Sequence, residues 1–192
     1  MLRLGRGKGR ETLPIATKWA ISHSGAKGIS AVDYEAMTTQ KPIYPDPPLT
    51  DGTIRVRPWT MHDLPAVEQA SQDTYITSVT SVPSTYTESE GTAFIERQWE
   101  RIKSDAGLSL CIADAHTDTA LGYVGLRFRL QGRASFGYWV VPDARGRGIA
   151  TAAVRLVTLW AFSALGVARL EILVEPWNTG SIRVAEQAVQ LQ

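Results

Sequence analysis

The fold is decided by residues 138–150, which read Tyr-Trp-Val-Val-Pro-Asp-Ala-Arg-Gly-Arg-Gly-Ile-Ala. The apolar start predicts a strand that stops at Pro142, and the apolar periodicity that follows predicts a helix over residues 148–165. A helix N-terminus presents unpaired backbone N–H groups and a partial positive charge, which together attract anions. Gly146 and Gly148 keep side chains away from the backbone at this point. The junction therefore predicts a phosphate-binding loop.

The same loop excludes two rival nucleotide-binding motifs. A Walker loop needs a Lys followed by Ser or Thr after its last glycine, where this chain has Ile149 and Ala150. A dinucleotide fingerprint needs glycine or alanine three positions after its second glycine, inside a parallel crossover. Thr151 stands at that position, and the preceding strands predict a meander. Arg145 and Arg147 add positive charge within reach of phosphate oxygens.

The flanking sequence predicts a mixed α/β domain of the α+β type, in which helices flank a mostly antiparallel sheet. Thr60 followed by Asp63 indicates a capping box at the start of the first helix, and residues 71–88 are predicted to form a loop rich in Ser, Thr and Pro. The predicted order is β-α-α-β-β-β-α-β-α, with strands at 53–57, 108–113, 121–130, 134–141 and 168–174, and helices from 60, at 90–104, at 148–165 and from 178.

These residues resemble the GNAT superfamily of acyl-CoA N-acyltransferases. Arg145, Gly148 and Ala150 match its Gln/Arg-x-x-Gly-x-Gly/Ala loop. Further matches resemble the RimJ/RimL type: Gly137-Tyr138-Trp139-Val140, Trp160-Ala161-Phe162, Leu165-Gly166, Glu171, Asn178 and Ser181. The resemblance covers residues 49–188. It implies direct transfer of an acetyl group from acetyl-CoA to a primary amine, without a metal.

The resemblance also implies a role for each part of this region. The backbone around Val140 and Val141 holds the pantetheine arm of acetyl-CoA like an added strand, and Asn178 contacts the same arm. Ser181 is the candidate proton donor to the leaving thiolate, and a helix-capping role for it is an equal alternative. The pyrophosphate is held by Arg145, Gly146, Arg147, Gly148, Ile149 and Ala150.

The residue sequence leaves the general base open. Ser135 stands where many relatives place a Glu, and Glu171 on the neighbouring strand is more consistent with a salt bridge. The single cysteine, Cys111, lies between apolar residues and is interpreted as a buried, inert thiol, which fits a reducing cytoplasm. The three histidines are scattered without ligand spacing, so no metal site is predicted.

The acyltransferase domain is predicted to span residues 49–192, after a disordered or extended segment over residues 1–48. Residues 1–36 show no helical or strand period, and Met37 opens a proline-rich stretch, so Met37 is a candidate natural start. The family normally continues after the last predicted helix with a Gly-Phe pair and two strands, which this sequence lacks up to Gln192. We therefore expect a truncated or frame-shifted product with an exposed sheet edge and poor solubility.

Composition limits the partners. The chain has 44% hydrophobic and 20% charged residues, as soluble domains do, and no apolar run long enough to span a membrane. Residues 37–192 hold more acidic than basic residues, so nucleic acid is not expected as a partner. The expected partner is an amine acceptor, either a protein N-terminus or a small molecule, and a homodimer is left open. The alternative is a non-catalytic acyl-CoA-binding or regulatory module.

Overall fold

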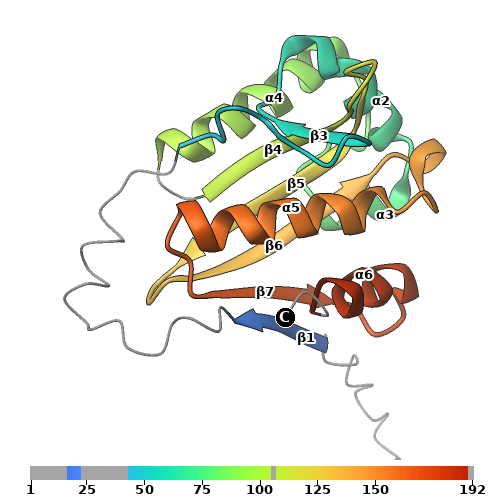
Figure 1. The fold of residues 1–192 in the computed structure, drawn as a ribbon. Helices are drawn as coiled ribbons and strands as arrows, with labels where there is room; N and C mark the ends of the chain where they lie inside the picture. Colours follow the sequence, from blue (N-terminus) through green and yellow to red (C-terminus); the bar gives the residue numbers. More distant parts are fainter. Residues whose placement is uncertain (1–16, 23–42, 105–106, 190–192) are drawn as a thin grey trace, which may run out of the picture.

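The computed structural model describes residues 17–22, 43–104 and 107–189. They form a seven-stranded sheet with the strand order β1-β7-β6-β5-β4-β3-β2 (Figure 1). Neighbouring strands are antiparallel except β6 and β7, which are parallel. The strands are β1 (Thr17–Ser22), β2 (Leu49–Thr50), β3 (Ile54–Arg57), β4 (Gly107–Asp114), β5 (Ala120–Arg129), β6 (Arg133–Val140) and β7 (Arg169–Val174). The helices are α2 (Leu64–Ser71), α3 (Thr74–Val79), α4 (Glu88–Lys103), α5 (Ile149–Ala164) and α6 (Thr179–Val189).

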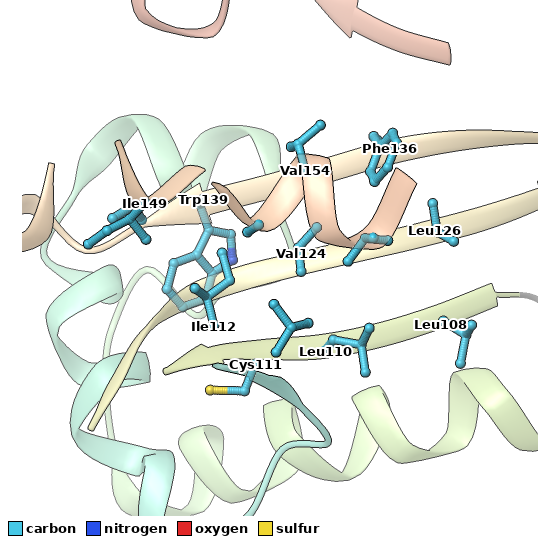
Figure 2. Packing of buried hydrophobic residues seen from close by; sticks show 14 of the residues in the cluster. Leu108, Leu110, Cys111, Ile112, Val124, Leu126, Phe136, Trp139, Ile149 and Val154 are labelled. Atoms are coloured by element: carbon cyan, nitrogen blue, oxygen red, sulfur yellow. The ribbon is translucent and has the colours of Figure 1, made fainter. Parts of the chain in front are cut away.

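Helices cover both faces of the sheet. On one face α4 packs against β4 and α2, and on the other α5 packs against β3 and β6 (Figure 1). Because β4 lies between these layers, it is buried along nearly its whole length. Figure 2 shows Val124 and Val154 on the α5 side and Cys111 on the α4 side. Burial of a Val side chain such as these contributes about 1.5–3 kcal/mol to the stability of the fold, relative to leaving it exposed.

An aromatic cluster anchors α4 to the sheet. The ring of Trp59 lies 5.7 Å from that of Phe94 and 5.9 Å from that of Trp139, measured between centroids. Trp99 donates a hydrogen bond from its indole N–H to the Trp59 carbonyl at 2.8 Å. Trp99 therefore belongs to the packing of α4 against the rest of the core.

A buried ion pair fixes the entry to the first helix. Arg57 at the end of β3 makes two hydrogen bonds to the Asp63 carboxylate, at 2.8 and 2.9 Å. The same carboxylate accepts a hydrogen bond from the Thr60 N–H at 2.8 Å, which confirms the predicted capping box. Asp63 is thus satisfied by charge and by backbone, as a carboxylate must be when it is removed from water.

The predicted order of the main elements is confirmed, including the meander from β4 to β6 and the strand, loop and helix around residues 138–150. The loop predicted over residues 71–88 needs a correction, because it contains α3. Asp73 caps this helix: its Oδ1 accepts hydrogen bonds from the N–H groups of Tyr75 and Ile76, both at 2.9 Å. No helix among the described residues is long and apolar enough to cross a membrane.

The N-terminal segment contributes a strand that the sequence analysis did not predict. Residues 17–22, inside the segment expected to be disordered or extended, form β1 and pair with all six residues of β7. The edge of β7 that was expected to be exposed is therefore covered, and that expectation is wrong for this edge. The proposed start at Met37 and residues 190–192 lie outside the described residues.

Candidate functional site

A cleft opens where β6 and β7 separate. The two parallel strands are paired from Arg133 to Phe136 on β6, but both continue beyond that point, to Val140 and Val174. The opening is a cavity of about 980 Å³, lined by both strands and by residues of α3, α4, α5 and α6. The strand on each side thus contributes backbone groups that no other strand pairs with.

The backbone of β6 offers a free edge to this cleft. Val141 donates its N–H to the Leu121 carbonyl at 2.9 Å, on the β5 side. Residues alternate along an antiparallel ladder, so the backbone groups of Tyr138 and Val140 face the other way, toward β7. An extended ligand with amide groups can therefore pair with the backbone of Tyr138 and with the Val140 N–H, whereas the Val140 carbonyl already accepts a hydrogen bond from Arg145. Val141, which the sequence analysis grouped with Val140, has its N–H already bonded and does not line the cavity.

The loop before α5 has the geometry of an anion site. Gly146 and Gly148 line the cavity and adopt left-handed backbone angles, with φ of 73° and 75°. The start of α5 at Ile149 has no side-chain cap and no acidic residue in its first turn. The N–H groups of this turn are therefore left for an external acceptor, and the helix dipole favours an anionic one. Ala150 lies in the same turn and also lines the cavity.

The two loop arginines differ in their surroundings. Arg145 lies in the cavity wall, but it donates from Nε to the Val140 carbonyl at 3.0 Å and forms an ion pair with Asp73 at 2.7 Å. Burial raises the pKa of Asp73, but hydrogen bonds from the Ile76 N–H and from Arg145 outweigh that effect and lower it. Arg147 is exposed and is not part of the cavity wall. The anion site is therefore built mainly from backbone.

Asn178 and Ser181 meet at the start of α6, inside the cavity wall. The Asn178 side chain accepts a hydrogen bond from the Ser181 N–H and donates one to the Tyr75 hydroxyl, both at 2.9 Å. Asn178 thus supplies the cap of α6, so the Ser181 side chain is not needed for it. The hydroxyl of Tyr138 is buried beside the Ser181 side chain. Burial raises the pKa of Tyr138, and the nearby Ser181 hydroxyl offsets part of this increase.

Two other sequence candidates lie outside the cleft. Glu171 forms ion pairs with Lys18 at 2.8 Å and Arg169 at 3.0 Å, which confirms the salt-bridge interpretation. Lys18 and Arg169 both lower the pKa of Glu171. Cys111 is buried, and that burial raises the pKa of its thiol, in agreement with an inert role. Among the described residues, no group of three or more His, Cys, Asp or Glu side chains could hold a metal ion.

Several cleft residues were not found from the sequence. Glu175, at the end of β7, is the single carboxylate among the described residues that line the cavity. Gln98 and Arg101 reach it from α4. None belongs to a recognisable motif. For Gln98 and Arg101, the only available signal was their spacing of three residues on one helix face, next to Phe94.

Comparisons with known proteins agree with this geometry. Residues 53–188 match the acetyltransferase (GNAT) domain family. Over 92 residues the chain is 39% identical to the "Probable N-acetyltransferase YjcK" of Bacillus subtilis, covering 46% of this chain and 51% of that protein. The chain thus spans about half the length of this curated relative.

Solved structures share the fold at low sequence identity. An acetyltransferase of the GNAT family from Bacillus anthracis has a TM-score of 0.63 and 16% identity, covering 76% of this chain and 82% of its own. Mycobacterium smegmatis RimJ in complex with CoA-disulfide has a TM-score of 0.61 and 21% identity, covering 72% and 71%. At these identities the likeness shows the arrangement of the elements.

Proposed function

The chain belongs to the GNAT acetyltransferase family, and from this membership we propose that it transfers an acetyl group from acetyl-CoA to a primary amine. The acceptor is a protein N-terminus or a small molecule, and the catalytic domain is the segment 49–192. The observation that carries the proposal is the cleft between β6 and β7, which has an uncapped helix N-terminus at one end. Family membership alone would not show whether this chain has kept the donor-binding site.

The cleft residues fit the donor in two places. The N–H groups of the first turn of α5, with Gly146 and Gly148 before them, suit the pyrophosphate. The backbone groups of Tyr138 and the Val140 N–H, which face the cleft, suit the amide groups of the pantetheine arm. Asn178, beside them, is oriented by its contact with Tyr75. The RimJ structure, with its CoA-disulfide, supports donor binding in this fold.

The reaction needs a base, an oxyanion stabiliser and a donor for the leaving group. A primary ammonium has a pKa near ~10.4, so a proton must leave before the nitrogen can attack the thioester carbon. We assign this step to Glu175, directly or through a water molecule. Of the Tyr138 and Val140 N–H groups that face the cleft, the one that the pantetheine arm leaves unbonded can stabilise the oxyanion. When the carbon–sulfur bond breaks, Ser181 donates a hydrogen bond to the thiolate. The buried Tyr138 hydroxyl lies next to Ser181.

A second candidate is a module that binds acyl-CoA without turnover. Ser135, where many relatives have a Glu, favours it, as does the pairing of Arg145 with Asp73. Titration calorimetry with acetyl-CoA tests binding, and release of free thiol in the presence of a panel of amines tests transfer. Binding with no thiol release from any amine would establish the module, and absence of both would reject both functions.

A matched pair of variants tests the base. Glu175→Gln removes the cleft carboxylate, whereas Glu186→Gln removes an exposed carboxylate on α6. We expect Glu175→Gln to lower turnover about 10²-fold or more while acetyl-CoA affinity stays unchanged. Glu186→Gln should leave both values at the wild-type level. Equal turnover of the two variants would remove Glu175 from the mechanism.

A further inference from the structure

A second hollow adjoins the cleft on the sheet face that carries Tyr123 and Trp139. It has a volume of about 320 Å³ and shares Arg101, Tyr123 and Gly137 with the main cavity. A side chain added at Gly137 would meet only the Tyr123 ring, at 3.9 Å, so the sheet backbone is bare at this point. The hollow therefore forms a path from the cleft, at the point where β6 and β7 begin to separate, onto the open sheet surface.

Among the described residues that line this hollow, every charged one is an arginine. Arg101 enters from α4, and Arg127 and Arg129 stand on β5. The strand register extends the series, because Arg129 lies opposite Arg133 on β6, and Arg133 lies opposite Arg169 on β7. Like charges directly opposite each other destabilise a sheet. The alignment of arginines across three strands therefore indicates that these side chains bind an anion.

The charges on this face are not balanced internally. Lys18 and Arg169 pair with Glu171, the one acidic residue that the described parts of β1, β5, β6 and β7 place on this side. The side chains of Arg127, Arg129 and Arg133 are exposed and make no ion pair or hydrogen bond among the described residues. We call the set the basic face, and its members are Lys18, Arg101, Arg127, Arg129, Arg133 and Arg169.

The extent of the basic face decides the kind of anion. Gly137 and Arg133 are four residues apart on β6, which is roughly 13 Å at about 3.3 Å per residue. A single carboxylate or phosphate next to an amine cannot reach from the cleft to the far end of this row. An extended peptide spans it with about four residues beyond the reacting amine. Charge complementarity then requires acidic side chains on that peptide.

We propose that the basic face binds an acidic polypeptide segment directly after the acceptor N-terminus. The proposal rests on the transferase function above and specifies its acceptor class: a polypeptide whose N-terminal residue enters the cleft and whose next few residues carry carboxylates. Arg127 and Arg129 meet the first carboxylates, and Arg133 meets the following ones. The neighbouring Arg101 is held in place by hydrogen bonds to the hydroxyls of Tyr123 at 3.0 Å and Ser109 at 3.4 Å.

The test separates peptide binding from transfer. Two peptides share one N-terminal residue and length, with Glu or Gln at positions 2 to 5, and each carries a fluorophore at its C-terminus. Fluorescence anisotropy gives their Kd values at low and high salt, and thiol release reports turnover independently. Each exposed ion pair accounts for about 1.5- to 5-fold in affinity. Three such pairs multiply to roughly 3- to 100-fold, so we expect wild-type protein to bind the Glu peptide at least about threefold more tightly, with the preference shrinking as salt rises.

Variants test which residues cause the preference for the Glu peptide. The triple variant R127Q/R129Q/R133Q should lose the preference for Glu while binding the Gln peptide and acetyl-CoA as wild type does. Arg155→Gln, which removes an exposed charge on α5, should keep the preference. Equal wild-type affinity for both peptides, or a preference that survives the triple variant, would overturn the proposal. Normal thiol release with such a result would refute only the acidic segment, whereas peptide preference without thiol release would refute only the transferase.

Discussion

Replacing Gly148 with Ala tests the anion site at the point where backbone conformation and ligand binding coincide. Gly148 has φ of 75°, and a β-carbon built on it meets no atom within 4 Å. The substitution therefore causes no steric clash within the described chain, and its cost to folding is conformational. A non-glycine residue in the left-handed region costs roughly 1–2 kcal/mol. We expect the free energy of unfolding in urea to fall by about that amount.

Gly52 provides a matched control. It lies in the turn before β3 with φ of 87°, and a β-carbon there also meets nothing within 4 Å. Gly52→Ala should thus lower stability by a similar ~1–2 kcal/mol. This turn does not contribute to the cavity wall, so Gly52→Ala should leave acetyl-CoA affinity unchanged.

The two variants should differ in ligand binding. A methyl group at Gly148 projects into the space over the first turn of α5, where the pyrophosphate is proposed to lie. Loss of one hydrogen bond to a charged group costs about 1.5–3 kcal/mol, which is roughly 10- to 100-fold in Kd. Titration calorimetry with acetyl-CoA measures this directly. A Kd for Gly148→Ala within twofold of wild type, or an equal loss in Gly52→Ala, would refute the assignment of the loop.

Three further predictions concern the cleft and its supports. Ser181→Ala should lower turnover about tenfold or more in a thiol-release assay without changing acetyl-CoA affinity. A changed affinity with normal turnover would contradict its role as donor. Asp63→Ala leaves the Arg57 guanidinium without its buried partner. It should lower the free energy of unfolding in urea by about 3–5 kcal/mol, which the removal of an exposed carboxylate should not do. Asp73→Asn keeps an oxygen for the helix cap but removes the charge facing Arg145, so it should cost less than about 1 kcal/mol near pH 7. Because the folded-state pKa of Asp73 is lowered, that difference should disappear as the pH falls through this pKa, and a difference that grows in acid would contradict the ion pair.

The parts of the fold that were predicted correctly are those whose signals are local. The meander from β4 to β6 follows from alternating apolar runs separated by turn residues, and α5 follows from its apolar stripe. α3 was missed because its apolar content is small and its start depends on one capping residue, Asp73, within a polar stretch. β1 was missed because its six residues are stabilised by a partner strand far away in the chain.

In the candidate site, too, the parts with local sequence signals were predicted and the parts that depend on distant segments were not. The loop with Gly146 and Gly148 was found because glycine, helix start and strand end are adjacent in sequence. The pairing of Arg145 with Asp73 was not predicted, because it depends on α3, which no local pattern placed beside the loop. Glu175 and the arginine row depend on strand register, which the residue pattern of a single strand does not define.

The pairing of β1 with β7 has a consequence for the order of events during synthesis. Ala20 pairs with Glu171, so the ribosome must add about 150 residues after the first strand before its partner exists. At roughly 5–20 residues per second, this delay is about 8–30 s. During that time β1 emerges into a crowded surrounding with no edge to join. The earliest strand among the described residues is therefore among the last to be incorporated into the sheet, and proteins that recognise unpaired strands have that interval in which to bind it.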